Sequence, residues 1–293
     1  MKRGTPRFFM KNFKNKIGLA LGGGAARGWA HFGIIRALAE QGIKPDVVCG
    51  TSIGALVGAS YVTGCMEGFE DWVSNLRKRD VAAMLDFTVG GGLIEGERLM
   101  NFLRNEIAIN ANIEELQTPY ASVATDLETG MEIWFQNGDL LDAVRASISL
   151  PGLFTPVCLN NKWLADGALV NPVPVSVCRA LGAEQIIAVD LNAHMVGKSF
   201  RKEEHHQALP DINEEDKNIS SWFNGVVEKV FNNNDTEDEE PGLFDVMNSA
   251  ITIMQDRITR SRMAGDPPDV LLRPDLSDIG MMDFDKGKEA IEK

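Results

Sequence analysis

The first 64 residues alternate between short apolar runs and longer segments with helical periodicity. An apolar run over residues 16–24 ends in three glycines, which is typical of a buried strand entering a loop. Residues 26–42 then repeat apolar side chains at helical spacing and stop at a glycine. A second apolar run over 44–50 precedes a second helical segment over 52–64. This order predicts an α/β fold with a parallel sheet covered by helices.

The rest of the chain continues the pattern less regularly. Helical stretches are expected through about residue 117. Further elements are predicted as strands over 120–127, 131–136 and 184–193, a helix over 139–152 and a hairpin over 154–172. Near the C-terminus, Met247, Ile251, Met254 and Ile258 recur on one face of a last helix. This spacing favours a stripe packed on the core, and a lipid-contacting face is the alternative.

Charge is distributed unevenly along the chain. The formal net charge is −13, which argues against a nucleic-acid partner because phosphate backbones favour basic surfaces. Residues 201–240 carry much of the negative excess and are predicted to be a mobile, solvated insertion in a single domain over 16–293. Residues 1–15 instead form a basic arm with several phenylalanines. Contact with an anionic bilayer surface is one interpretation of this arm, and a solvated tail is the other.

Targeting and metal-binding signals are weak in this sequence. The apolar run after the basic arm is too short and too rich in glycine for a signal peptide or a membrane span. We therefore predict a cytoplasmic chain, with the inner face of the membrane as its peripheral location if the arm binds lipid. The four histidines and four cysteines show no zinc-site spacing, and we expect neither a metal nor a cofactor.

Residues 50–54, Gly-Thr-Ser-Ile-Gly, match the G-x-S-x-G pattern of a serine nucleophile on a tight turn. The match falls between a predicted strand and a predicted helix, which is the context that exposes such a serine. Gly50 and Gly54 would leave room where the strand and the helix crowd together. The helix N-terminus would favour negative charge developing on Ser52. Ser52 is therefore a candidate nucleophile, and a helix-capping serine with packing glycines is the alternative.

The glycine run before the first helix is a candidate oxyanion hole. The N–H groups of Gly22, Gly23 and Gly24 could donate to the oxyanion of a tetrahedral intermediate. The run lacks both the lysine of a P-loop and the last glycine of a dinucleotide-binding fingerprint. A turn that packs helix on strand is the alternative. Arg27 is a candidate to hold the loop or contact an anionic head group, and an exposed side chain is equally compatible with its position.

A serine hydroxyl needs a base to accept its proton. His194 is the histidine best placed for a Ser-Asp-His triad, whereas His31 is expected to be a packed residue. Three aspartates, Asp126, Asp166 and Asp190, also stand near predicted strand ends. The second of them, with the glycine after it, equally fits a hairpin turn. The residues alone leave the identity of the base open.

Four blocks, in their order along the chain, resemble those of bacterial patatin-like phospholipases. They read GLALGGGAARGWAHFGIIRAL, CGTSIGALVGA, RASISLPGLFTPV and LADGALVNPVPV. The likeness is strongest to the small bacterial members related to the catalytic domain of neuropathy target esterase. It covers residues 16–195 closely and the C-terminal segment from residue 269 loosely, whereas residues 201–240 have no counterpart in the family pattern. The resemblance implies a patatin-like three-layer α/β/α fold with a mainly parallel central sheet.

The resemblance also implies a Ser-Asp dyad without a histidine. Ser52 matches the family nucleophile, and Asp166 matches the aspartate of an Asp-Gly-Gly/Ala motif, in its Ala form here. The glycines at 22–24 match the oxyanion loop, and Arg27 matches the basic residue after it. An ordinary carboxylate is a weak base, so Asp166 would have to be partly desolvated and close to the serine. The implied substrates are acyl-ester lipids such as phospholipids, lysophospholipids or glycerides.

Two other functions are compatible with the sequence. The first is a small-ester α/β-hydrolase that uses a Ser-Asp-His triad. The second is a catalytically silent patatin-fold protein that binds a partner, for instance through its acidic insertion. The sequence identifies no protein partner.

Overall fold

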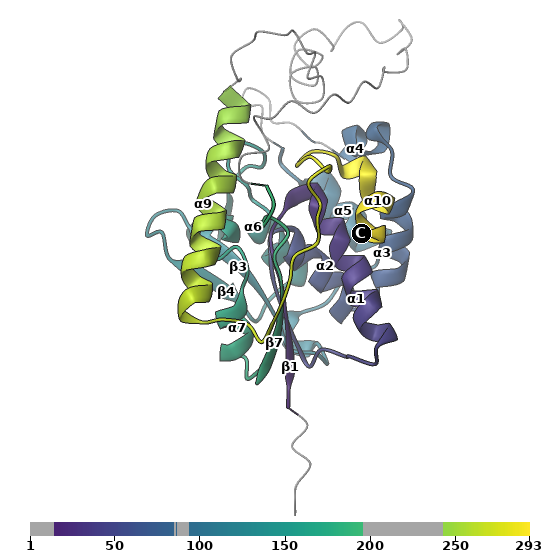
Figure 1. The fold of residues 1–293 in the computed structure, drawn as a ribbon. Helices are drawn as coiled ribbons and strands as arrows, with labels where there is room; N and C mark the ends of the chain where they lie inside the picture. The colour runs from purple at the N-terminus through teal and green to yellow at the C-terminus, as the bar shows by residue number, and fades with distance from the viewer. Residues whose placement is uncertain (1–14, 85, 87–93, 196–242) are drawn as a thin grey trace, which may run out of the picture.

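The computed structural model describes residues 15–84, 86, 94–195 and 243–293. A central sheet lies between two layers of helices (Figure 1). The basic arm up to residue 14 and the acidic segment predicted over 201–240 lie outside the described residues.

The sheet has eight strands in the order β5-β6-β3-β2-β1-β7-β8, with β4 paired to β3 off this path. The strands are β1 (Ile17–Leu21), β2 (Val47–Thr51), β3 (Tyr120–Asp126), β4 (Glu132–Phe135), β5 (Val157–Leu159), β6 (Lys162–Asp166), β7 (Gln185–Val189) and β8 (Val270–Leu272). All pairs from β3 through β2, β1 and β7 to β8 are parallel. The pairs β3–β4, β3–β6 and β5–β6 are antiparallel. The predicted mostly parallel sheet is therefore confirmed.

Helices cover both faces of this sheet. They are α1 (Ala30–Glu40), α2 (Ile53–Val62), α3 (Met66–Ser74), α4 (Lys78–Met84), α5 (Glu97–Asn105), α6 (Leu140–Ser147), α7 (Val175–Ala180), α9 (Leu243–Gly265) and α10 (Gly287–Glu292). Short 3-10 helices are η1 (Ala25–Trp29), η2 (Ile113–Glu115), η3 (Gly167–Leu169) and η4 (Phe284–Lys286). Helices α1, α3 and α10 lie on one side of the sheet, and α7 and α9 lie on the other (Figure 1). This arrangement confirms the α/β/α layers.

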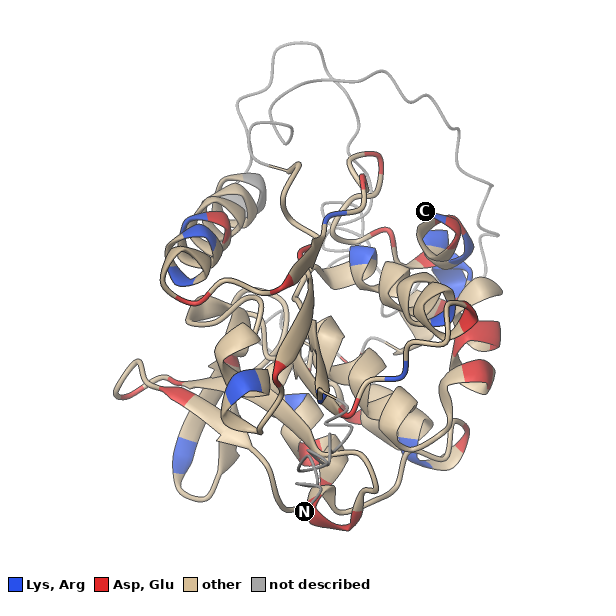
Figure 2. Ribbon diagram, turned by 60° about the horizontal axis from the view of Figure 1, so that its bottom comes forward, with Lys and Arg blue, Asp and Glu red and all other residues tan. Residues whose placement is uncertain are grey.

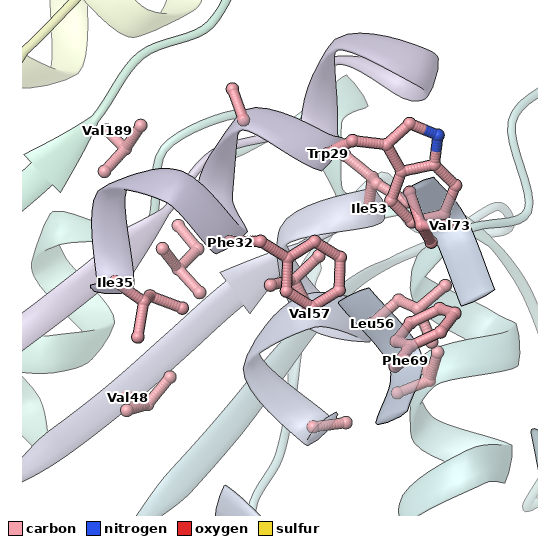
Figure 3. Close-up of a cluster of buried hydrophobic side chains, with 14 of the residues drawn as sticks. Trp29, Phe32, Ile35, Val48, Ile53, Leu56, Val57, Phe69, Val73 and Val189 are labelled. Atoms are coloured by element: carbon pink, nitrogen blue, oxygen red, sulfur yellow. The ribbon is translucent and has the colours of Figure 1, made fainter. Parts of the chain in front are cut away.

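Alternating side chains of the central strands supply a core on each face. Leu19 and Leu21 belong to the large cluster under α1 and α2, where aromatic residues such as Trp29 and Phe69 pack edge to face (Figure 3). Between the two leucines, Ala20 faces the smaller cluster under α7. Charged residues gather on the surrounding helices and loops, and the central strands carry few of them (Figure 2). Burial on both faces explains the continuous apolar runs of β1 and β2.

The last long helix, α9, faces the sheet with its polar side. Met247 and Met254 are 39% and 51% exposed, so the predicted core-packing stripe is wrong at these two positions. The buried stripe consists of Ser249, Thr252, Asp256 and Thr259. The physical reason is that the residues packed against this face of α9 include polar side chains. One of them is Asn192, whose Nδ2 donates to Gln255 Oε1. None of the helices described is long and apolar enough to cross a bilayer.

Candidate active site

Strand register brings Ser52 and Asp166 together although 114 residues separate them. Strand β3 pairs with β4 along residues 122–125, which occupies one of its two edges. Its other edge is shared, because β2 pairs with β3 only as far as Thr51 opposite Val123, and the antiparallel pairing with β6 begins with Asp166 opposite Ala124. The last residue of β2 and the last residue of β6 are therefore neighbours along the same edge. Ser52, which follows β2 directly, emerges beside Asp166.

The turn that carries Ser52 is strained and tightly packed. Ser52 has φ 56° and ψ −127°, which is an uncommon conformation for a residue other than glycine. A Cβ added to Gly50 would lie 2.4 Å from the backbone of Ala55, and one added to Gly54 would lie 2.2 Å from Leu21 O. Both glycines thus stand where strand and helix approach closely. Because Ser52 also precedes α2, its side chain lies at the positive end of that helix.

Ser52 Oγ donates a hydrogen bond to Asp166 Oδ2 over 2.6 Å. Asp166 is only 1% exposed, and its other carboxylate oxygen, Oδ1, accepts from the N–H of Ala168 over 2.8 Å. Burial raises the pKa of Asp166 to about 7, although the hydrogen bonds from Ser52 and Ala168 act in the opposite direction. A carboxylate with a pKa near neutrality is a far better proton acceptor than an ordinary aspartate.

The other candidate bases have different surroundings. Lys162 donates to Asp126 Oδ2 over 2.9 Å and holds the pKa of Asp126 down at about 2. Burial raises the pKa of Asp190, whose carboxylate lies 3.4 Å from the Arg273 guanidinium. His194 is exposed in a turn after β7. Of the aspartates and histidines considered, only Asp166 has a hydrogen bond to the Ser52 hydroxyl in the described part of the structure.

The glycine loop offers fewer free amides than the sequence suggests. Gly22 N–H donates to Val189 O over 3.1 Å, and Gly23 N–H donates to Pro172 O over 3.0 Å. In the described structure both amides are therefore engaged within the protein and extend the hydrogen bonding of the loop to its neighbours. Within the described residues, no hydrogen bond occupies the N–H of Gly24 or of Ala25. Ala25 has φ 49°, a left-handed conformation in which alanine is strained.

The two basic side chains of this region are buried under the loop. Arg27 is only 2% exposed, so the exposed position considered from the sequence is wrong. Its Nε donates to Gly24 O over 3.2 Å, and burial lowers its pKa to about 10. His31 Nε2 lies 2.8 Å from Gly22 O, and burial lowers its pKa to about 4. Since a neutral His31 can donate to this carbonyl, both residues hold the glycine loop in place.

An apolar pocket opens beside Ser52. It holds about 780 Å³ of empty space, counting the part open to solvent, and it is lined by residues of η1, α2, α4, α5, η4 and the segment after α6. Apart from Ser52, every lining residue is hydrophobic, including Ala25, Leu56, Leu99 and Phe154. This lining suits an apolar ligand group. Among the described residues, no group of three or more His, Cys, Asp or Glu side chains is placed to hold a metal ion.

Comparison with known proteins identifies the family. The family model "Patatin-like phospholipase" matches residues 19–179. An uncharacterized NTE family protein of Mycobacterium tuberculosis is 31% identical over 319 aligned residues, which cover 94% of this chain and 88% of that protein. The chain belongs to the patatin-like phospholipase family.

Relatives that match a shorter part of the chain agree with this assignment. The neuropathy target esterase of Drosophila melanogaster is 37% identical over 186 residues, which cover 61% of this patatin-like chain and 13% of that protein. Patatin-like phospholipase domain-containing protein 6 of Mus musculus is 32% identical over 186 residues, covering 61% and 14%. At the level of the family, the chain is a lipid acyl hydrolase.

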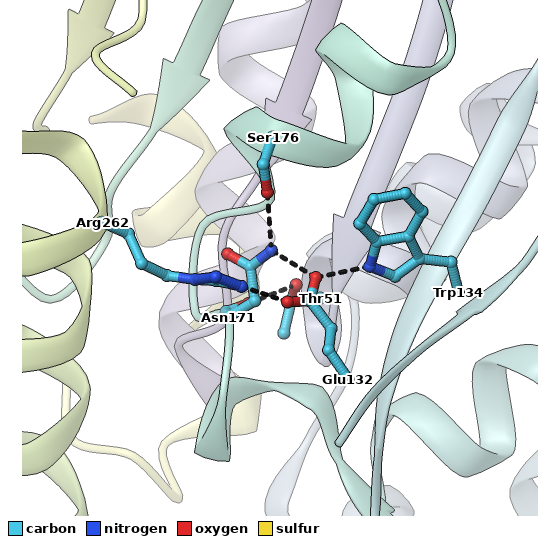
Figure 4. A network of polar contacts seen from close by, with 6 residues as sticks. All are labelled: Thr51, Glu132, Trp134, Asn171, Ser176 and Arg262. Carbon is cyan, nitrogen blue, oxygen red and sulfur yellow. Dashed lines mark hydrogen bonds and ion pairs between the residues drawn. The ribbon is translucent and has the colours of Figure 1, made fainter. Parts of the chain in front are cut away.

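Several residues that support the patatin-like site could not be selected from the sequence. Thr51 Oγ1 donates to Asn171 O over 2.9 Å, and Asn171 Nδ2 donates to Glu132 Oε1 over 2.6 Å (Figure 4). Arg262 of α9 forms an ion pair with Glu132 in the same network (Figure 4). This network ties the end of β2 to β4 and α9. Ser147, which contacts the Ser52 backbone, was also missed, because a serine inside a helical pattern carries no signal of its own.

Proposed function

We propose that this chain is a serine acyl-ester hydrolase of the phospholipase A or lysophospholipase type, which acts through a Ser52–Asp166 dyad. The observation that carries the proposal is the 2.6 Å hydrogen bond from Ser52 Oγ to the buried carboxylate of Asp166. The apolar pocket beside Ser52 supports a lipid substrate, because it would shelter an acyl chain from water.

In the proposed reaction, Ser52 Oγ attacks the ester carbonyl carbon while Asp166 takes the hydroxyl proton. Collapse of the tetrahedral intermediate breaks the bond to the leaving alcohol, which receives that proton from Asp166. A water molecule then attacks the acyl-enzyme, again giving its proton to Asp166. When the second intermediate collapses, Ser52 Oγ departs from the acyl group and takes that proton from Asp166, and the fatty acid is released. The pKa of about 7 lets Asp166 act as base and acid in turn near neutral pH.

The N–H groups of Gly24 and Ala25 are the proposed oxyanion donors. Both belong to the loop beside Ser52, and neither is engaged by another group in the described residues. Ala25 lines the same pocket as Ser52, which supports a role for its backbone beside the reacting carbonyl. Gly22 and Gly23 shape the loop, whose carbonyls are held by His31 and by the side chain of Asn192. Removing one such donor typically costs about 10²–10³ in rate.

Covalent labelling tests the proposal directly. An alkyl fluorophosphonate is expected to attach to Ser52 in the wild type and not in Ser52→Ala. Hydrolysis of a panel of phospholipids and lysophospholipids should then be lost in Ser52→Ala and Asp166→Asn and kept in His194→Ala. Folded protein that neither labels nor hydrolyses would favour a silent scaffold. Loss in His194→Ala together with activity in Asp166→Asn would favour a triad.

A further inference from the structure

Ser147, the last residue of α6, holds the backbone of the proposed nucleophile. Its Oγ accepts a hydrogen bond from the N–H of Ser52 over 2.8 Å. The same hydroxyl donates to Val123 O over 2.6 Å, and Ser147 is fully buried. The hydroxyl therefore accepts from one backbone group directly after β2 and donates to another within β3. One hydroxyl thus fastens the strained turn to β3.

The carbonyl at the far end of this link lies beside the base. Val123 is followed by Ala124, which pairs with Asp166 across the β3–β6 ladder. Val123 O also stands 2.2 Å from where a Cβ on Gly167 would lie, so it packs directly against the residue after Asp166. Ser147 thereby connects the backbone of Ser52 to the part of β3 that positions Asp166.

The same segment holds the base from a second point. Asp166 N–H donates to Ser149 O over 2.9 Å. Ser149 is in turn fixed by Arg145, whose Nη1 donates to Ser149 Oγ over 2.7 Å. Ser147, the last residue of α6, and Ser149, two residues after it, therefore contact the backbones of Ser52 and Asp166 respectively. A shift of this segment would change the distance between the two.

We propose that Ser147 is a positioning residue for the hydrolytic reaction: its hydroxyl holds Ser52 in the strained turn from which Oγ reaches Asp166. This inference rests on the proposed function of the dyad. Without the hydroxyl, the N–H of Ser52 loses its partner, and nothing else in the described hydrogen bonding replaces it. The turn then relaxes toward commoner backbone angles, and the approach of Oγ to Asp166 is no longer fixed.

The test compares Ser147→Ala with Ser122→Ala in the full chain. Ser122 is an equally buried serine whose Oγ donates to Ala143 O over 3.1 Å, so it also links β3 to α6 but does not contact Ser52. With a fluorogenic lysophospholipid, kcat should fall about 10- to 100-fold in Ser147→Ala, with KM within about twofold of wild type. The rate of fluorophosphonate labelling at Ser52 should fall in parallel. Ser122→Ala should stay within about threefold.

The pH profile supplies a reading that a purely structural role would not move. The hydrogen bond from Ser52 lowers the pKa of Asp166, so loosening it should shift the rising limb of the profile to higher pH in Ser147→Ala only. Ser147→Thr keeps the hydroxyl and should restore most of kcat. If the threonine variant does not fold, Ser147→Cys, whose thiol is a weaker acceptor, replaces it in the test. Equal kcat losses and unshifted profiles in Ser147→Ala and Ser122→Ala would overturn the inference. Absence of any Ser52-dependent hydrolysis in the wild type would instead refute the proposed function.

Discussion

Replacing Asp166 by asparagine should abolish activity and yet stabilise the fold at alkaline pH. The asparagine is nearly isosteric, and its Oδ1 can accept from the N–H of Ala168 as the carboxylate does. Its Nδ2 can donate to Ser52 Oγ, so the contact to the nucleophile is kept with the proton reversed. The substitution removes the carboxylate that would accept the proton, and it also removes the cost of burying a negative charge.

The size of the stabilisation follows from the pKa of Asp166. Burial raises it from 3.8 to about 7, a difference that corresponds to about 4 kcal/mol. Below pH 3.8 the carboxyl is neutral in both the folded and the unfolded chain, so its burial carries no cost of ionisation. As the pH rises toward about 7, the unfolded chain releases this proton first, and the free energy of unfolding falls. Above about pH 7 the loss is complete.

Urea denaturation at pH 5 and pH 8 measures this effect. The free energy of unfolding of Asp166→Asn minus that of the wild type should be about 2–3 kcal/mol larger at the higher pH. Asp126→Asn is the matched control, because Lys162 holds the pKa of Asp126 at about 2 and its ionisation is complete in both states by pH 5. Its difference from wild type should not change between the two pH values.

Enzyme activity offers an independent reading of the same pKa. The wild-type kcat/KM should rise about tenfold per pH unit up to about 7, where Asp166 becomes ionised, and then level off. A profile that is flat from pH 5 to 8, together with a pH-independent stability difference for Asp166→Asn, would refute the reasoning that burial sets the strength of this base.

Two further predictions concern packing around the site. Gly54→Ala should lower the free energy of unfolding in urea by at least about 2 kcal/mol, because the added Cβ would lie 2.2 Å from Leu21 O. Gly68→Ala is the control: its added Cβ would meet nothing within 4 Å, so it should be neutral or slightly stabilising. Leu56→Trp should fill the pocket beside Ser52 and lower kcat/KM for p-nitrophenyl palmitate at least about tenfold more than for p-nitrophenyl butyrate; an unchanged ratio would mean that the acyl chain lies elsewhere.

The layers and the candidate nucleophile could be predicted because they depend on local patterns. The apolar runs of β1 and β2 are buried on both faces, and such strands show in the sequence without any knowledge of their neighbours. Ser52 stands between a strand and a helix, so its motif could be checked by its immediate context. Asp166 required the resemblance to a family, because three aspartates near strand ends were equal on spacing alone.

The remaining features depend on contacts between distant segments. The amides of Gly22 and Gly23 are engaged by Val189 and Pro172, and no local pattern shows which glycine amide stays free. Helix α9 reads as amphipathic with an apolar stripe toward the core, but its position is decided by polar partners such as Glu132, which pairs with Arg262. In both cases tertiary hydrogen bonds override the preference that the local pattern indicates.

The proposed use of an aspartate as base follows from where β6 ends. Asp166 takes the place on the β3 edge that β2 vacates at Thr51, so it is enclosed between strands, and burial raises its pKa to about 7 against the opposing effect of its hydrogen bonds. That is the range in which a histidine would act. The position of Asp166 on the sheet therefore gives an aspartate the basicity that a histidine has by its chemistry. This position lowers the stability of the fold, and the Asp166→Asn variant should recover that stability. The same edge-sharing explains why one hydroxyl, that of Ser147, can hold Ser52 against β3, the strand that pairs with Asp166.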